Sequence, residues 1–171
     1  SAALAQRLRG SYGPAGAFTV IEGASSAVEA SEPVLILGGG LMGLALAHQL
    51  ARRGQSVQVI SRRRSEAAGF VAAGMLAPHA EGLSGELLAL GQRSLELVPS
   101  WLQQVEADSD LDCGHRPCGI VVPFRSEQER DAFPTASCGV ALNRDALERE
   151  IPGIAAGWST GLLFEQDGQI D

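Results

Sequence analysis

The clearest hydrophobic pattern in the chain begins directly after Pro33. Residues 34–37 are four consecutive apolar side chains between that proline and a glycine, a pattern typical of a strand buried on both faces. A glycine-rich turn follows at 38–43, and residues 44–53 repeat apolar side chains at helical spacing before a glycine suited to end a helix. Residues 56–60 alternate apolar and polar side chains, which predicts a second strand. This order predicts a right-handed βαβ unit with a parallel sheet.

A second group of elements is predicted further along the chain. Residues 85–105 carry apolar side chains three and four positions apart, which predicts an amphipathic helix that Pro99 should kink or split. The remaining predicted elements are strands at 119–124 and 161–164, a short helix at 143–150 capped by Asn143, and a turn entering a strand at 167–171. The chain is therefore predicted to be of the α/β class.

The first 33 residues differ in composition from the rest. They are rich in Ala, Ser, Gly and Glu, and only the run 18–21 resembles a strand, which predicts a flexible leader. The sequence starts at Ser1 without a methionine, and its last residues enter a strand. We therefore expect a processed product or a fragment.

Composition narrows the class of protein. The chain has 171 residues, 45% of them hydrophobic and 19% charged, with 21 glycines, which is typical of a soluble α/β domain. Its formal charge of −7 gives no reason to expect a nucleic-acid partner. No apolar run reaches the roughly 18 residues that a membrane span needs, and no signal-peptide pattern is present, so we expect a cytoplasmic protein. Three cysteines without zinc-type spacing predict free thiols and no metal site.

The glycine turn carries the main chemical signal. Gly38-Gly39-Gly40-Leu41-Met42-Gly43 matches G-x-G-x-x-G. In this pattern Gly38 permits the tight turn, Gly40 lets the backbone approach a pyrophosphate, and Gly43 lets the helix pack closely on the strand. The helix N-terminus then holds the phosphates with unpaired N–H groups and its positive dipole end. The motif alone is weak evidence, but a strand before it and a helix after it are the context that it requires, which favours a dinucleotide site over a turn without a ligand.

The end of the second strand leaves the choice of dinucleotide open. An acidic residue about 20 positions past the turn usually binds the ribose hydroxyls, whereas Ser61 occupies this position here. Arg62, Arg63 and Arg64 follow it and could accept a ribose 2′-phosphate, which would favour NADP. The alternative is that the three arginines form a solvated loop edge, as exposed charge runs usually do.

The segment 71–81 decides between these cofactors through a resemblance. Taken alone, its small apolar residues favour a packed helix start over a ligand loop. Together, GGGLMG and AAGMLAPHAE resemble the FAD-dependent glycine oxidases of thiamine biosynthesis, within the D-amino-acid and sarcosine oxidase family. The resemblance extends from about Val34 to Asp171, and it is looser through LGQRSLELVPSWLQQ, CGIVVPF and DGQID.

The resemblance implies an FAD-binding Rossmann-type sheet over 34–115 and the beginning of a mixed α+β substrate domain over 116–171, after the leader at 1–33. It places the FAD pyrophosphate on Gly38, Gly40, Leu41, Met42 and Gly43, and the adenosine ribose on Ser61 and Arg62. It places the flavin side of the cofactor along Ala68, Gly69, Ala73, Gly74 and Met75.

Two departures from the family pattern affect what the resemblance implies. The usual ribose-binding glutamate is Ser61 here, which bears on the affinity for FAD more than on its identity. Family members are also about twice as long, and the arginine that binds the substrate carboxylate lies in the part that this chain lacks. The catalytic residues are therefore unknown.

The three histidines have no assigned catalytic role. For His79 we favour a structural role over acid–base chemistry, because hydride transfer from an amine to flavin asks little of a protein base. We expect His48 on the surface or in packing, and His115 in a loop.

The sequence is compatible with three functions. The first is an FAD-dependent oxidase that converts glycine or another small amine, with O₂, to an imine and peroxide, the imine serving thiamine thiazole synthesis or hydrolysing to glyoxylate and ammonia. The second is an NADP-binding reductase. The third is a truncated fragment that binds cofactor poorly and self-associates through uncovered apolar surface. The sequence does not decide among glycine, sarcosine and D-amino acids, and it leaves homo-oligomerisation open.

Overall fold

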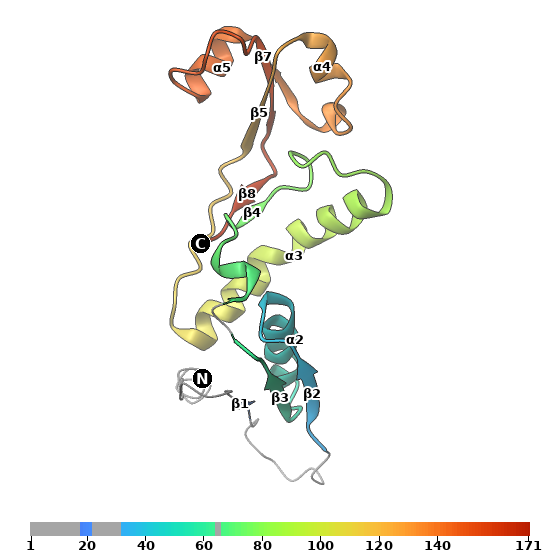
Figure 1. Cartoon of the computed structure of the whole chain (residues 1–171), viewed down its shortest axis with the longest axis vertical. Coiled ribbons are helices and arrows are strands. Elements are labelled where there is room, and N and C mark those ends of the chain that lie inside the picture. Colours follow the sequence, from blue (N-terminus) through green and yellow to red (C-terminus); the bar gives the residue numbers. More distant parts are fainter. Residues whose placement is uncertain (1–17, 22–31, 64–65) are drawn as a thin grey trace. The chain divides into compact units, whose positions relative to one another are not determined.

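The computed structural model describes residues 18–21, 32–63 and 66–171, and its elements are labelled in Figure 1. The chain divides into two compact units. The first contains residues 1–72 and 103–111, and the second contains residues 73–102 and 112–171.

The first unit is built on a three-stranded sheet of β1 (Phe18–Ile21), β2 (Val34–Leu37) and β3 (Val57–Ile60), in the order β1-β3-β2. β2 pairs with β3 in parallel, from Val34 opposite Val57 to Leu37 opposite Ile60. β1 pairs with β3 in the antiparallel direction, so the strand-like run 18–21 is a strand of this sheet. The rest of the expected leader, apart from residues 32 and 33, lies outside the described residues.

Helix α2 (Leu41–Arg52) connects the two parallel strands and completes the predicted βαβ unit (Figure 1). Gly54 follows with a φ of +79°, and its N–H donates to the Ala51 carbonyl, which ends the helix as predicted. The buried core of this unit forms where the helix packs on the sheet. Its members are Ile36, Ala47, Ala51, Val57 and Val59.

One expectation about this sheet is wrong. β2 was expected to be buried on both faces, but only Ile36 is buried, whereas Leu35 is 53% and Leu37 77% exposed. The reason is the strand's position at the sheet edge, with α2 against one face and no described residue burying the other. Leu46, one of the apolar side chains of the predicted helix at 44–53, is also exposed.

Two antiparallel sheets form the centre of the second unit. The larger has the order β5-β7-β6, from β5 (Ile120–Phe124), β6 (Val140–Leu142) and β7 (Thr160–Phe164), and its core contains Phe124, Leu162 and Phe164. The smaller pairs β4 (Met75–Leu76) with β8 (Gly168–Gln169). The helical elements are α3 (Gly85–Ser109), α4 (Glu127–Asp131) and α5 (Arg144–Glu150), with 3-10 turns η2 (Ala68–Phe70) and η3 (Ala136–Cys138). Of these, η2 and the last turns of α3 belong to the first unit.

Most predicted elements of the second half are confirmed, and one expectation is wrong. Pro99 lies inside α3 without splitting it, and the helix extends to Ser109, past the predicted end at residue 105. The segment 71–81 starts no helix, because Gly74 adopts a φ of +68° and the chain passes through β4 into a turn. Asn143 caps α5 as predicted, its side chain accepting from the Ala146 N–H at 2.9 Å. None of the described helices has the length and apolar character required to cross a membrane.

Candidate nucleotide-binding site

The glycine turn lies between β2 and α2 in a conformation that only glycine adopts easily. Gly38 has a φ of +117°, and its N–H donates to the Ile60 carbonyl at 2.8 Å, which fixes the turn to the end of β3. Gly40 is the N-cap of α2, with extended backbone and no side chain that caps the helix. The first N–H bonded within the helix is that of Leu44, which donates to Gly40 at 3.0 Å.

The space around the glycines distinguishes packing from ligand approach. A Cβ on Gly43 would overlap the Gly38 carbonyl oxygen, so this glycine is required for the close contact of helix and strand. A Cβ on Gly40 would meet nothing within 4 Å. The motif therefore contains one glycine that is needed for the fold and one that leaves the helix N-terminus open to a ligand.

The electrostatics of the open end suit an anion. α2 has twelve residues, and its first turn contains no acidic side chain. Leu41 and Met42 in this turn are 60% and 82% exposed. Unpaired N–H groups and the positive end of the helix dipole therefore face solvent without a competing carboxylate. This arrangement fits a pyrophosphate.

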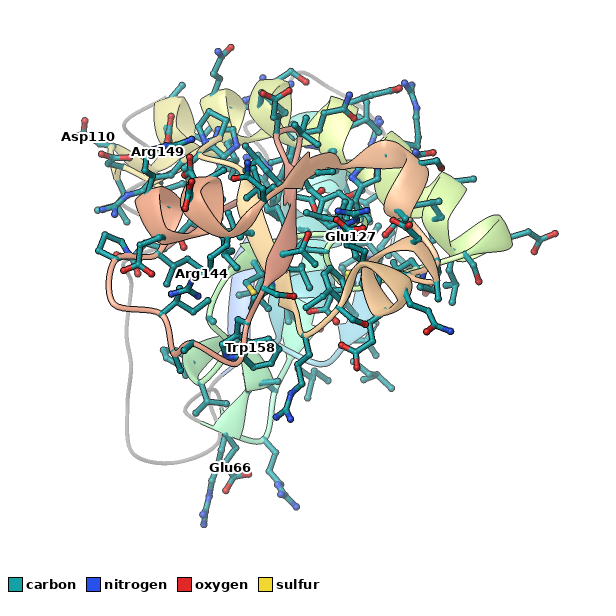
Figure 2. All side chains as sticks on the ribbon, turned by 90° about the horizontal axis from the view of Figure 1, so that it is seen from above. Glu66, Asp110, Glu127, Arg144, Arg149 and Trp158 are labelled. Atoms are coloured by element: carbon teal, nitrogen blue, oxygen red, sulfur yellow. The ribbon has the colours of Figure 1, made fainter. Side chains whose placement is uncertain are left out.

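The residues after β3 contact the turn and each other. A Cβ on Gly39 would lie 2.7 Å from the Ser61 Cβ, which shows that the Ser61 side chain lies directly on the turn. Arg62 and Arg63 each bind Glu66 at 3.1 Å, and Glu66 stands out from the surface in Figure 2. This is the solvated loop edge that was one of the two interpretations of the arginines. Arg64 lies outside the described residues.

The residues expected along the flavin are held in two different ways. Ala68 and Gly69 belong to the exposed turn η2 of the first unit. Ala73, Gly74 and Met75 belong to the second unit, where the Gly74 carbonyl accepts from the Ile170 N–H at 2.8 Å.

Gly74 is a position where only glycine fits. Its φ is positive, and a Cβ there would overlap the Ile170 carbonyl oxygen. Met75 pairs with Gln169 and is 54% exposed. The segment 73–75 is therefore held through its backbone and keeps an exposed side chain.

His79 has the structural role expected of it, through a partner that sequence reasoning did not identify. Its side chain is 3% exposed, and its Nδ1 lies 2.7 Å from Oδ1 of the fully buried Asp167. Gln92 lies 3.2 Å from Nε2, and the Thr135 hydroxyl donates to the His79 carbonyl at 2.6 Å. The sequence signal available was the acidic residue at the start of DGQID, which is recognisable only once the two strands β4 and β8 are paired.

A second buried ion-pair cluster joins α2 to the last turns of α3. Asp108 accepts from Arg52 and, at 3.0 Å, from His48 Nε2. Burial alone would raise the pKa of Asp108, but hydrogen bonds from Arg52 and His48, together with their charge, hold it below the ordinary aspartate value. Among the described residues, His48 Nδ1 is buried without a hydrogen-bond partner. His48 is therefore a packing residue, as expected.

The described residues contain no group of three or more His, Cys, Asp or Glu side chains placed to hold a metal ion. Cys118 and Cys138 are free thiols, as predicted from their spacing. The glycine turn thus remains the best-supported ligand site.

The fold and the turn together define a dinucleotide-binding α/β protein. Residues 33–171 match the family model DAO, described as FAD dependent oxidoreductase, and the chain belongs to this family. The predicted resemblance is confirmed, and FAD is the cofactor of the family.

Two curated relatives show where in the family the similarity lies. The chain is 35% identical over 144 residues to a bifunctional protein ThiO/ThiG of Nostoc sp., a match covering 81% of this chain and 22% of the relative. It is 30% identical over 149 residues to a glycine oxidase of Geobacillus kaustophilus, covering 80% and 39%. The chain thus spans about a fifth to two fifths of the length of these relatives.

Solved structures agree with the fold. The crystal structure of glycine oxidase from Geobacillus kaustophilus superposes with a TM-score of 0.66 at 25% identity, covering 80% of this chain and 40% of that one. Glycine oxidase from Bacillus cereus superposes with a TM-score of 0.69 at 24% identity, covering 81% and 39%. The predicted FAD-binding Rossmann-type class is confirmed.

Proposed function

We propose that this chain is the cofactor-binding portion of an FAD-dependent oxidase of a small amine or amino acid, with glycine as the first candidate substrate. The observation that carries the proposal is the open N-terminus of α2, where Gly40 leaves room for a pyrophosphate and no first-turn carboxylate opposes it. The similarity to glycine oxidase and to ThiO/ThiG proteins supports the substrate and a place in thiamine thiazole synthesis.

The proposal assigns the nucleotide half of FAD to the first unit. The turn would hold the pyrophosphate through backbone N–H groups, and Ser61 would offer a hydroxyl to the ribose in place of a carboxylate. The proposed cofactor-binding residues are Gly38, Gly40, Leu41, Met42, Gly43, Ser61, Arg62, Ala68, Gly69, Ala73, Gly74 and Met75. In this proposal residues 34–115 form the first part of the FAD-binding domain, and residues 116–171 form the start of a substrate domain.

When bound, FAD would supply a two-electron acceptor for a hydride from the substrate C–H bond, the substrate nitrogen would lose a proton, and O₂ would reoxidise the reduced cofactor and leave as hydrogen peroxide. Glycine would leave as iminoacetate, which water hydrolyses to glyoxylate and ammonia. The residues of this chain bind and orient the cofactor in the proposal, and its catalytic residues are unassigned. The free thiols of Cys118 and Cys138 accord with a cytoplasmic location, which is part of the proposal.

The family match favours FAD over NADP. Arg62 and Arg63, two of the three arginines that the NADP alternative invoked, each pair with Glu66 at an exposed loop edge. FAD is therefore the cofactor that we propose.

A titration of the purified chain with FAD and with NADP, followed by absorbance and flavin fluorescence, tests the cofactor. Binding of FAD and not of NADP is expected, and the reverse would contradict the proposal. Peroxide release on addition of glycine, sarcosine or a D-amino acid tests the substrate, in this chain and in one extended to the length of its relatives. Peroxide from neither chain with any of these substrates would contradict the proposed reaction.

A further inference from the structure

Asp167 is a fully buried carboxylate with no part in the proposed site. Its Oδ1 lies 2.7 Å from His79 Nδ1, and its Oδ2 accepts from the Ala80 N–H at 2.8 Å. A buried carboxylate is costly unless charge-assisted hydrogen bonds compensate it, and both oxygens are compensated here by residues from a single turn. Asp167 is therefore a fixed anchor for the turn that follows β4.

The imidazole of His79 also contacts side chains of two other elements, α3 and β7. The Gln92 amide nitrogen can only donate, so its placement 3.2 Å from Nε2 assigns the ring proton to Nδ1. The Nδ1–H then donates to Asp167. The ring also stacks on Phe164 of β7, with centroids 6.1 Å apart. His79 is thus held on both nitrogens and on one face, in one orientation.

The hydrogen bonds of Asp167 lie at one end of the two-stranded sheet of β4 and β8, which holds residues 73–75. β4 and β8 contribute only two residues each, with Met75 opposite Gln169 and Leu76 opposite Gly168. A ladder of this length is marginal by itself. Asp167 precedes β8 and binds the turn after β4, so its two hydrogen bonds close the end of the ladder opposite the backbone bond between Ile170 and Gly74.

We infer that Asp167 and His79 are positioning residues that set the segment Ala73–Met75 against the flavin half of the cofactor. The inference rests on the proposed function, which assigns this segment to the flavin. Asp167 and His79 are not among the proposed cofactor-binding residues. They act through the register of β4 on β8 and through the fixed backbone of Gly74.

The test is a comparison of FAD with ADP, because ADP contains only the half assigned to the glycine turn. In Asp167→Asn one acceptor oxygen becomes a donor that faces an N–H group, which weakens the anchor without a change in volume. We expect the Kd for FAD to rise about tenfold and the Kd for ADP to stay within about twofold. The visible circular dichroism of bound FAD should also change, because the protein surroundings of the ring are displaced.

Rescue and control variants separate positioning from general stability. His79→Asn keeps a donor near the Nδ1 position, so its Kd for FAD should lie closer to the wild-type value than that of His79→Ala. Asn143→Ala removes the cap of α5 in the same unit, at a cost of about 1 kcal/mol, and the Asn143 side chain accepts its hydrogen bond from Ala146 of that same helix. It should lower thermal stability and leave both Kd values unchanged.

The outcomes distinguish the inference from the proposed function. If the wild-type chain binds no FAD, the proposed function fails and this inference fails with it. If the wild-type chain binds FAD and Asp167→Asn binds it equally well, the inference alone is overturned. Equal loss of FAD and ADP in Asp167→Asn, or an FAD-selective loss in Asn143→Ala, would also overturn it.

Discussion

Gly43 in the first turn of α2 lies against the carbonyl oxygen of Gly38, so closely that a Cβ on Gly43 would overlap that oxygen. The contact joins the start of the helix to the end of the strand before it. Gly40, only three residues away, has open space where its side chain would be. The two glycines of one motif therefore have separable roles, one in packing and one in leaving space for a ligand.

Gly43→Ala is expected to damage the fold as well as cofactor binding. The added methyl group meets backbone atoms that cannot rotate away, so the helix must shift from the strand. We expect a loss of about 1 to 3 kcal/mol in the free energy of unfolding, measured by urea titration. Gly157→Ala is the control, because a Cβ there meets nothing within 4 Å. Equal stability of Gly43→Ala and wild type would contradict the packing role.

Gly40→Asp is expected to separate stability from binding. Aspartate is a favoured N-cap residue, and its carboxylate also interacts well with the helix dipole, so unfolding should cost a few tenths of a kcal/mol more. The same carboxylate occupies the N–H groups and repels a pyrophosphate, so the Kd for ADP and for FAD should rise at least about tenfold. Thermal melting and fluorescence titration measure the two effects. Undiminished FAD binding would place the pyrophosphate elsewhere.

Asp108→Asn is expected to change how stability depends on pH. Because contacts with Arg52 and His48 hold the pKa of Asp108 below its ordinary value, ionised Asp108 stabilises the fold above the unfolded-state pKa of about 3.9. This contribution is lost as pH falls through the lower, folded-state pKa. The wild type should therefore be more stable than the variant at neutral pH, and the difference should shrink below about pH 4.

Urea titrations from neutral pH down to about pH 3 measure this difference. Asp110→Asn is the matched control, since it makes the same charge change at an exposed position labelled in Figure 2, and asparagine tolerates the positive φ of 58° found there. A stability difference for Asp108→Asn that is independent of pH would show that the ion-pair cluster is not its source.

Arg144→Lys is expected to loosen the segment after α5. Arg144 and Trp158 are labelled in Figure 2. The Arg144 guanidinium donates to the carbonyl oxygens of Ile154 at 2.9 Å and Trp158 at 2.8 Å, and it also binds Glu148. Lysine cannot make these bonds together, because it lacks the planar fork of donors. We expect a loss of about 1 to 2 kcal/mol in the free energy of unfolding.

The control for this substitution is Arg149→Lys on the same helix, where the side chain is exposed and labelled in Figure 2. Its stability should stay within about 0.5 kcal/mol of the wild type. Hydrogen exchange at residues 151–159 should quicken in Arg144→Lys only. Unchanged exchange in this segment would contradict the role assigned to Arg144.

Much of the fold could be predicted because its signals are local. The glycine end of α2 and the Asn143 cap each depend on residues within about one turn of chain. The parallel pair of β2 and β3 follows from three consecutive elements between Val34 and Ile60. The same holds for the glycine turn, where backbone freedom at Gly38 and the open N-cap follow from neighbouring residues. Short-range hydrogen bonding and hydrophobic spacing are properties that a sequence displays directly.

Predictions that depended on burial were less successful. The apolar run of β2 was expected inside a sheet covered on both faces, yet Leu37 is 77% exposed. An apolar run shows that a strand can be buried. Whether the strand is buried depends on which elements pack against its two faces. Likewise, the segment 71–81 was expected to start a helix, and pairing of β4 with β8 from the other end of the unit overrode that preference.

By itself, the sequence determined the βαβ unit, its dinucleotide motif and the family, because each depends on residue types at short, fixed spacings. Tertiary structure alone decided that Ser61 lies on Gly39 and that His79 meets Asp167 across 88 positions of sequence. Such partners come together only when distant strands are brought into register. A buried polar side chain needs a hydrogen-bond partner, but that partner can come from any part of the chain. The sequence separation of the two residues therefore does not reveal that they pair.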